Sequence, residues 1–467
     1  MNTENINTEN TNKDDRQEAV TGNDDNRPGE ETGNGDQITG ALLQENGNDI
    51  NRKSGKKDIK GKLPFVLIGL IIGLSISPMI MLLMIKIKGR DGLQLINGPK
   101  LFKKDTFVSK QVDDKIKTIE NSIEQNYFFD VTDKELEEGI YEGMLEATGD
   151  RYADYYTKDD IKNLQEKTTG VFYGIGAYVG IDQATNYPKL TGIMEKTPAE
   201  EAGLKAGDIV IEVDGENVRG MELSDVVSRI KGDRGTTVVL KIYRNGENEY
   251  RDITVTRDKV ESPTVTYEKM DDGMAYIYIH QFESVTSGQF EEKLKQARDD
   301  KMKGLILDLR GNPGGTLESV INIARQILPE GLIVYTEDKY GNRNEYKCDG
   351  HNKLEVPLVV LVNEDSASAS EILSGAIKDY GIGKLVGKNT YGKGIVQKVF
   401  YISDGTAMKL TVSHYYTPKG NDIHEVGIKP DVDVDLDVDK YLDEDTDTQL
   451  EKAKEVLKGM MDNSEKE

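Results

Sequence analysis

Hydroxyl side chains crowd into one short segment of the C-terminal half, where a serine could attack a carbonyl carbon. The segment 362–381, VNEDSASASEILSGAIKDYG, leads from an apolar run through small polar residues into a helical pattern. Ligands of open α/β sheets bind at the C-terminal ends of strands, so Ser368 is a candidate nucleophile. Ser368 and Glu371 also match the S-x-x-E capping box, in which the serine only caps a helix. On spacing alone we favour the capping role.

A lysine between two glycines is the second candidate. Lys393 lies in the segment 389–397, NTYGKGIVQ, and Gly392 and Gly394 let the backbone bend there and approach other atoms closely. A lysine acts as a general base only if its amine is neutral near pH 7. That requires its pKa to fall by about three units, at a cost of about 4 kcal/mol. A solvent-facing lysine in a tight turn is the more common origin of such a pattern.

The third feature is a glycine-rich turn after an apolar strand, residues 307–315, LDLRGNPGG. Backbone N–H groups of such a turn can stabilise a developing oxyanion, which is usually the largest contribution to catalysis of acyl transfer. An ordinary strand-end loop or a phosphate cradle would fit equally well, although the G-x-x-x-x-G-K-[ST] phosphate pattern is absent.

The remaining titratable residues suggest structural roles. Glu371 is expected to be a cap partner and Asp308 a strand-end residue. Core or surface positions are expected for the four histidines, and Cys348 in its polar stretch is interpreted as an incidental thiol. Four histidines and one cysteine exclude a disulfide framework and leave no recognisable zinc pattern. The histidines are His280, His351, His414 and His424.

The hydrophobic pattern predicts an α/β core. Between residues 274 and 435 apolar strand patterns (AYIYI, GLILDLR, PLVVLVN, GKLVG, TAMKLTVSHYY) alternate with helical ones, which is typical of a substantially parallel sheet. Residues 106–165 show helical periodicity and predict two or three amphipathic helices. Residues 171–256 predict short strands separated by glycine turns. The acidic run and the final helix at 449–461 into which it leads are expected to be solvated surface.

Charge and length limit the function further. The chain has 467 residues, too many for one compact core, and 84 acidic residues against 60 basic ones give a net charge of −24. This balance argues against nucleic acid as a partner.

The middle segment resembles a PDZ domain. The resemblance rests on YGIG at 173–176 and on TPAEEAGLKAGDIVIEVDGENV at 197–218. It implies a mainly-β domain whose loop N–H groups hold the terminal carboxylate of a peptide while a strand edge pairs with the peptide backbone. The loop residues would be Tyr173, Gly174, Ile175, Gly176 and Ala177.

The combination of these segments resembles the carboxyl-terminal processing proteases, tail-specific serine peptidases with a Ser-Lys catalytic centre. The likeness covers about residues 106–435, and SASASEI and GKGxVQ carry it. It implies that Ser368 is the nucleophile, Lys393 the general base and Gln397 the residue that positions the lysine. It also implies that the N–H groups of Gly314 and Ala369 bind the oxyanion.

Two points qualify this assignment. In a straight strand Lys393 and Gln397 would stand about 13 Å apart, so the chain must bend at Gly394 to bring them together. Ser366 and Ser370 are competing hydroxyls, but each would be out of register with the family pattern.

The N-terminal part predicts a membrane anchor. Residues 1–62 lack aromatic side chains and are expected to be a disordered cytoplasmic tail. Residues 63–85 carry no charge and predict a transmembrane helix. Six basic residues lie between 52 and 62, before the span, and three lie between 86 and 90, after it. This excess on the N-terminal side favours a cytoplasmic N-terminus and an extracytoplasmic catalytic portion.

We therefore expect a single-pass, membrane-anchored serine endopeptidase that needs no metal or cofactor and selects protein substrates by apolar C-terminal tails. Homodimer formation through the 106–165 helices and the C-terminal segment is expected by similarity. The alternative is a PDZ-bearing envelope adaptor or chaperone with an idle Ser-Lys site. The expected parts are the tail, the transmembrane span, linker and helices at 86–165, the PDZ domain at 166–258, the α/β core at 259–435 with helices 106–165, and the acidic segment and helix at 436–467.

Overall fold

The computed structural model describes residues 108–464. The expected tail and the expected transmembrane span at 63–85 both lie outside this range. Within it, no helix combines the length and the apolar character needed to cross a bilayer.

The described part of the chain begins with helices, as the periodicity predicted. Ser109 and Thr132 cap the first two through their side chains. No residue of these two helices is buried. The N-terminal elements are α2 (Lys110–Asn126), α3 (Asp133–Glu146), β1 (Asp154–Tyr156) and α4 (Lys158–Thr169).

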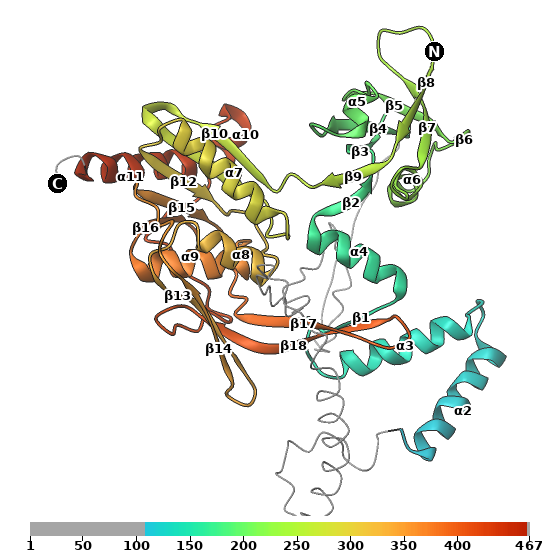
Figure 1. Cartoon of the computed structure of the whole chain (residues 1–467). Helices are drawn as coiled ribbons and strands as arrows, with labels where there is room; N and C mark the ends of the chain where they lie inside the picture. The colour runs from blue at the N-terminus through green and yellow to red at the C-terminus, as the bar shows by residue number, and fades with distance from the viewer. Residues whose placement is uncertain (1–107, 465–467) are drawn as a thin grey trace, which may run out of the picture. The chain divides into compact units, whose positions relative to one another are not determined.

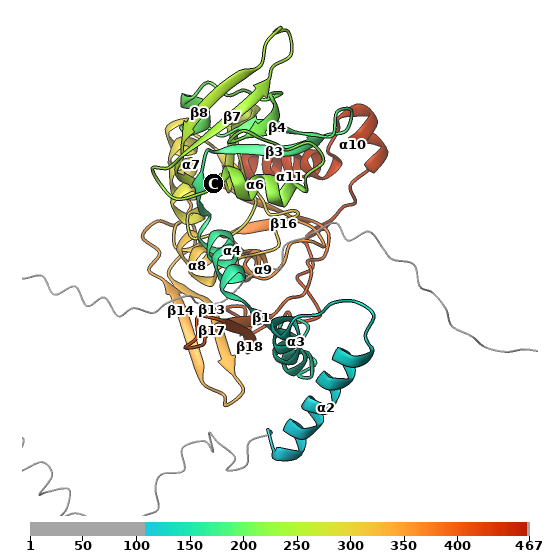
Figure 2. The same cartoon turned by 90° about the vertical axis from the view of Figure 1, so that its right-hand side faces the viewer.

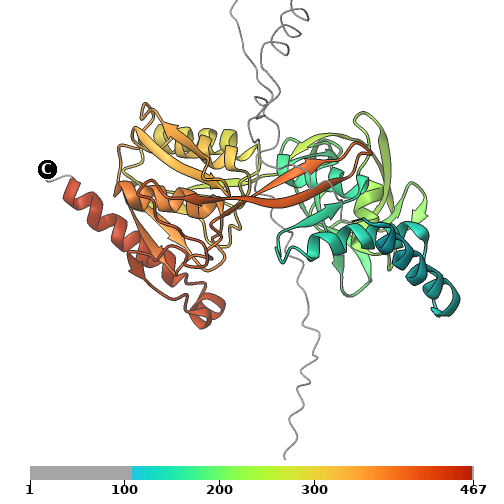
Figure 3. The same cartoon turned by 90° about the horizontal axis from the view of Figure 1, so that it is seen from below.

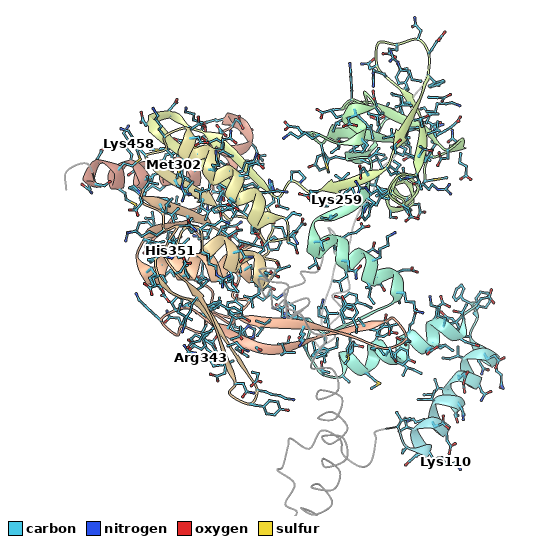
Figure 4. The ribbon with its side chains drawn as sticks, in the orientation of Figure 1. Lys110, Lys259, Met302, Arg343, His351 and Lys458 are labelled. Atoms are coloured by element: carbon cyan, nitrogen blue, oxygen red, sulfur yellow. The ribbon has the colours of Figure 1, made fainter. Side chains whose placement is uncertain are left out.

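A two-stranded ribbon leads to and from the mainly-β domain. Strands β2 (Val171–Gly174) and β9 (Asp258–Glu261) pair antiparallel, so the chain enters and leaves the domain side by side (Figure 1). Lys259, labelled in Figure 4, is on β9.

The inserted domain is built on one antiparallel sheet with the order β3-β4-β5-β7-β8. Alternating apolar residues of these strands form a separate core, which includes Leu190, Val210 and Leu240. The elements are β3 (Ala177–Asp182), β4 (Tyr187–Ile193), α5 (Pro198–Glu201), β5 (Ile209–Val213), β6 (Glu216–Asn217), α6 (Leu223–Ile230), β7 (Thr237–Tyr243) and β8 (Arg251–Thr256).

The main sheet of the core is parallel, as predicted, apart from one antiparallel edge strand. Its order is β10-β11-β12-β15-β16-β19. All residues of β12 and β15 are buried because helices cover both faces of the sheet. The elements are β10 (Val265–Lys269), η1 (Asp271–Gly273), β11 (Met274–Ile279), α7 (Thr286–Asp299), β12 (Gly304–Asp308), α8 (Leu317–Ala324), β15 (Leu358–Val362), α9 (Ala369–Tyr380), β16 (Gly383–Gly387) and β19 (Val432–Asp433).

The two faces bury different side chains. Leu305 and Leu307 of β12 face the cluster shared with α7, α8 and α9, whereas Ile306 faces α11 (Thr448–Ser464). Ala453 and Leu457 of α11 are fully buried in that second cluster. The expectation that the C-terminal helix is merely solvated surface was therefore wrong for this face, because its apolar residues cover an otherwise exposed sheet. The short helix α10 (Val438–Glu444) precedes α11 (Figure 2).

A second, antiparallel sheet was not predicted. Its order is β1-β18-β13-β14, and β17 pairs with the other edge of β18. The long strand β18 spans this sheet, with β1 alongside one end (Figure 3). The pattern TAMKLTVSHYY was correctly predicted as a strand but belongs here and not to the parallel sheet. The bounds are β13 (Gly331–Asp338), β14 (Arg343–Cys348), β17 (Ile395–Tyr401) and β18 (Ala407–Tyr416).

Candidate active site

Ser368 occupies the sharp turn between β15 and α9. Its side chain and backbone are 2% exposed, and it has φ 54° and ψ −109°, a conformation that L-residues rarely adopt. Strain of this kind persists only where the surroundings impose it, and it often marks functional sites. The same strand–turn–helix arrangement holds the serine of many hydrolases.

The competing serines have structural partners. The Ser366 hydroxyl donates to the carbonyl of Leu309 at 2.8 Å, and the Ser370 hydroxyl donates to that of Asn312 at 2.9 Å. Both hydroxyls thereby tie the α9 turn to the glycine-rich loop. Ser368, the serine between them, remains the candidate nucleophile.

Glu371 joins the serine turn to the lysine loop. Its Oε2 accepts the N–H of Ser368 at 2.8 Å and the N–H of Lys393 at 2.9 Å. Its Oε1 accepts the Thr390 hydroxyl at 2.6 Å and the Gly392 N–H at 2.7 Å. Burial raises the pKa of Glu371 above its usual value, although these four hydrogen bonds act against that shift. The predicted cap partner therefore does more than cap: it fixes both candidate catalytic segments to one side chain.

Lys393 is buried, with 3% of its surface exposed, so the common solvent-facing arrangement does not apply. Its Nζ lies 4.1 Å from the centre of the Tyr152 ring. Its carbonyl accepts the hydroxyl of Tyr415, which also donates to the carbonyl of Ser368 at 3.0 Å. A Cβ on Gly394 would lie 2.6 Å from the N of His424, so only glycine permits this close backbone approach.

Gln397 is 1% exposed and lies on β17, directly after an irregularity in the pairing of β17 with β18 between Val396 and Gln397. Its Nε2 donates to the Thr411 hydroxyl at 3.4 Å. Because Lys393 precedes β17 and the ladder shifts at this point, the straight-strand spacing of about 13 Å does not apply.

The expected oxyanion donors differ in their availability. Ala369 is the first residue of α9, and its N–H has no acceptor among residues 108–464, as is typical of a helix N-terminus. The N–H of Gly314 already donates to Asn312 Oδ1 at 2.8 Å. Gly314 nevertheless lies against the serine, because a Cβ built on it would be 2.8 Å from Ser368 Cβ. In this conformation one of the two predicted donors is engaged elsewhere.

A cavity of about 880 Å³ opens beside Gln397 between strands of the second sheet. Thr336, Thr411 and His414 contribute to its lining. Of the three candidate catalytic residues, Gln397 contributes to this lining, whereas Ser368 and Lys393 do not.

The predicted peptide loop of the inserted domain is only partly a loop. Tyr173 and Gly174 belong to β2 and pair with β9, whereas Ile175 and Gly176 link β2 to β3, which begins at Ala177. Within the described residues, the N–H groups of Ile175 and Gly176 have no acceptor, and no strand pairs with the outer edge of β3. These are the features that a peptide-binding groove needs.

The histidines take the packing positions expected of them. The ring of His280 lies edge-on to that of Tyr278 with ring centres 4.2 Å apart, and burial lowers the pKa of His280. His414 and His424 lie edge to face at 5.3 Å. Across 108–464, no three His, Cys, Asp or Glu side chains are arranged to hold a metal ion.

Sequence reasoning missed two contacts of the lysine loop, those with Tyr152 and Tyr415. Tyr152 comes from the segment between α3 and β1, and nothing in the local pattern around Lys393 points to it. Glu371 was visible in the S-x-x-E spacing, but its second role depends on a loop some 20 residues further along the chain.

Together, an α/β core, a serine in a strained turn and a buried lysine define the class of serine-type peptidases with a PDZ module. The model of peptidase family S41 matches residues 273–434, and the PDZ domain model matches residues 190–244.

Proteins of similar sequence support the same family assignment. A probable CtpA-like serine protease of Staphylococcus saprophyticus is 35% identical over 320 residues, which cover 68% of this chain and 64% of that protein. A carboxyl-terminal-processing protease of Synechocystis sp. is 35% identical over 325 residues, which cover 68% of this chain and 76% of that protein. The chain belongs to peptidase family S41 and, within it, to the carboxyl-terminal-processing proteases.

Among solved structures, the photosystem II D1 C-terminal processing protease matches with a TM-score of 0.41 and 30% identity, over 68% of this chain and 86% of that one. We rest the family assignment on the sequence relatives. The match spans less than two thirds of the staphylococcal protein's length.

Proposed function

We propose that this chain is a membrane-anchored serine endopeptidase that recognises the C-terminal tails of proteins through its PDZ domain and cleaves them through an acyl-enzyme. One observation carries the proposal: Glu371 Oε2 accepts the N–H groups of both Ser368 and Lys393. Two donors that share an acceptor at 2.8 and 2.9 Å lie within about 6 Å of each other. The backbones of the two proposed catalytic residues are thus held together.

The first chemical step is attack of Ser368 Oγ on the scissile carbonyl. The O–H bond breaks, its proton passes to the neutral amine of Lys393, and a C–O bond forms. The Ala369 N–H at the start of α9 faces the developing oxyanion, and the helix dipole favours negative charge there. The lysine then gives its proton to the leaving amine, which departs and leaves an acyl-serine.

The second step is hydrolysis of the acyl-serine. Lys393 takes a proton from water, the hydroxide attacks the ester carbonyl, and the proton returns to Ser368 Oγ. Removal of water from around an amine favours its neutral form, and the 3% exposure of Lys393 supplies that environment. Gln397, which is also buried and follows the lysine loop, positions the lysine.

Substrate selection follows from the PDZ domain. The unpaired edge of β3 accepts the tail as an added strand, and the N–H groups of Ile175 and Gly176 bind its terminal carboxylate. Ile175 is buried in the domain core beside this loop, which favours an apolar last residue.

The test is a pair of reporter proteins that differ only at the C-terminus. A reporter with a free apolar C-terminal residue should be cleaved at least tenfold faster, by kcat/KM, than one with an amidated or acidic terminus. Equal cleavage would contradict tail selection. Ser368→Ala and Lys393→Ala should each lower cleavage by at least 1000-fold with the fold retained, whereas Ser366→Ala should remain active.

A second candidate function is a PDZ-bearing adaptor or chaperone with an idle peptidase site. The observation in its favour is the Gly314 N–H, which donates to Asn312 and not toward the serine. A serine-reactive acylating probe separates the two functions. Labelling of the full-length chain at Ser368 that disappears in Lys393→Ala supports the enzyme, and absence of labelling at saturating probe supports the adaptor.

The anchor and the assembly are further parts of the proposal. The uncharged span at 63–85 and its basic flanks support a single-pass anchor with the catalytic portion outside the cytoplasm. Helices α2 and α3 bury none of their residues, and their apolar side chains Ile119, Ile140 and Met144 are exposed. These exposed side chains support a homodimer in which the helices pack against a second copy of the chain. Membrane fractionation and sedimentation of the full-length chain test the two statements separately.

A further inference from the structure

The amine of Lys393, the proposed general base, lies over the aromatic ring of Tyr152, a residue far from it in the sequence. Lys393 Nζ lies 4.1 Å from the ring centre of Tyr152, which stands between α3 and β1. A cation at this distance from a tyrosine face is attracted by the ring quadrupole, more strongly where water is excluded. The ring therefore favours the ammonium form of the lysine over the neutral amine.

The ring is held in place by a carboxylate that precedes it in the chain and by strand pairing that follows it. The Asp150 carboxylate accepts the Thr411 N–H at 3.1 Å and the Tyr152 N–H at 2.9 Å. β1, which follows, pairs with residues 407–409 of β18. The same strand β18 pairs with β17, which directly follows the lysine loop. Tyr152 is thus positioned by the same sheet that carries the loop.

A second cation contacts the same ring. Arg151 Nη2 donates to the Tyr152 hydroxyl at 2.6 Å and to the Tyr391 hydroxyl at 3.1 Å. The centre of its guanidinium lies 4.8 Å from the centre of the Tyr152 ring. Since Lys393 Nζ is 4.1 Å from that centre, the two cationic groups are no more than about 9 Å apart. A fixed positive charge at this range disfavours a second one.

We propose that Tyr152 and Arg151 are positioning residues for the general base, and that they act on the protonated lysine in opposite directions. The inference rests on the proposed Ser368–Lys393 chemistry. When Lys393 takes the proton of Ser368 Oγ, it becomes an ammonium ion, and the Tyr152 ring stabilises that ion in the transition state. Arg151 anchors the ring through its hydroxyl and keeps the resting amine neutral by repulsion.

The other groups near the lysine do not duplicate this arrangement. The Glu371 carboxylate contacts the backbone N–H of Lys393, and the Tyr415 hydroxyl contacts its carbonyl. His424 packs against Gly394 through its backbone and Cβ. The titratable and charged groups that surround the loop are Glu371 on α9, Tyr415 on β18, Tyr391 in the loop itself, His424, and the pair Arg151 and Tyr152.

The test is the pH dependence of kcat/KM for a cleaved reporter, whose rising limb reports the ionisation of the general base. Arg151→Gln should move this limb to higher pH by about half a unit at low salt, because a repelling charge is lost. At high ionic strength the shift should shrink, since Arg151 is exposed and its charge is screened. Arg151→Lys, which keeps the positive charge, should return the rising limb to the pH at which it lies in the parent.

Tyr152→Leu should move the limb in the opposite direction, to lower pH, and should lower kcat about tenfold with little change in KM. Tyr152→Phe keeps the ring but loses the hydroxyl that Arg151 holds, so its kcat should lie between those of the parent and Tyr152→Leu. The matched control is Arg343→Gln, which removes a guanidinium 3.5 Å from the ring of Tyr335 on the β13–β14 hairpin (Figure 4) and should leave the limb in place.

The inference would be overturned if Arg151→Gln and Tyr152→Leu moved the rising limb in the same direction, or if neither moved it. General damage to the fold would not move the limb in opposite directions in the two variants. Failure of the proposed function looks different. In that case Ser368→Ala would still cleave the reporter, or the unmodified chain would show no cleavage and no rising limb.

Discussion

At the scale of single residues, one buried carboxylate organises the candidate site. Glu371 meets four donors from two segments, so it stays satisfied although it is fully buried. The S-x-x-E spacing revealed its contact with Ser368, because capping is a local interaction. Its contact with the lysine loop depends on tertiary folding, and no local pattern encodes that.

We expect Glu371→Gln to lower kcat by about 10- to 100-fold and the free energy of unfolding by about 2–4 kcal/mol. The amide would place an NH2 donor against N–H donors, so at least one pair would be left unsatisfied. Cleavage kinetics and urea unfolding measure the two effects. The control is Glu364→Gln, at an exposed position before the same helix, where both values should stay within error of the parent.

At the scale of elements, the sequence predicted the parallel sheet better than the antiparallel one. Strands such as 304–308 and 358–362 are continuous apolar runs bounded by helices, and this pattern is local. Strand β17 is mixed in polarity, and β1 has three residues, so neither stands out from its surroundings. The pairing of β1 with β18 joins residues about 250 positions apart. The strand and helix that flank Ser368 could therefore be predicted from the sequence, whereas the contact of Tyr152 with Lys393 could not.

The lysine loop should depend on glycine at one position. We expect Gly394→Ala to lower the free energy of unfolding by about 2 kcal/mol or more and to abolish cleavage, because its Cβ would meet the backbone N of His424 at 2.6 Å. Gly459→Ala on α11 meets nothing within 4 Å and should stabilise the protein by up to about 1 kcal/mol. Thermal unfolding of both variants checks this contrast, and equal effects would count against it.

At the scale of the whole chain, the junction between α4 and the β2–β9 ribbon contains a half-buried acid. Glu283 packs against Gly170, the residue between α4 and β2, and its Oε2 has no hydrogen-bond partner within the described residues. Backbone hydrogen bonds of 2.8–3.3 Å tie residues 168–170 at this junction to Ser262, Ser284 and Val285. Burial raises the pKa of Glu283 to about 7.

This acid should make stability depend on pH. Between about pH 4.5 and 7 the unfolded chain ionises Glu283 while the folded chain keeps it protonated, so the free energy of unfolding falls as pH rises. Allowing for partial exposure, we expect a loss of about 1–2 kcal/mol over this range.

Glu283→Gln should remove that part of the pH dependence in urea unfolding of the full-length chain. Glu291→Gln, at an exposed position on α7, should not. A profile of Glu283→Gln with the same slope as that of the parent across this range would show that Glu283 is already ionised in the folded protein.

The paired strands β2 and β9 have a consequence for protein engineering. Neighbouring strands run about 4.8 Å apart, so the recognition module is spliced into the host through two adjacent chain ends. Any unrelated domain whose own termini lie close together could be grafted at that junction without stretching the recipient. Replacing the inserted domain in this way would change which substrates the enzyme binds and would leave the peptidase core unaltered.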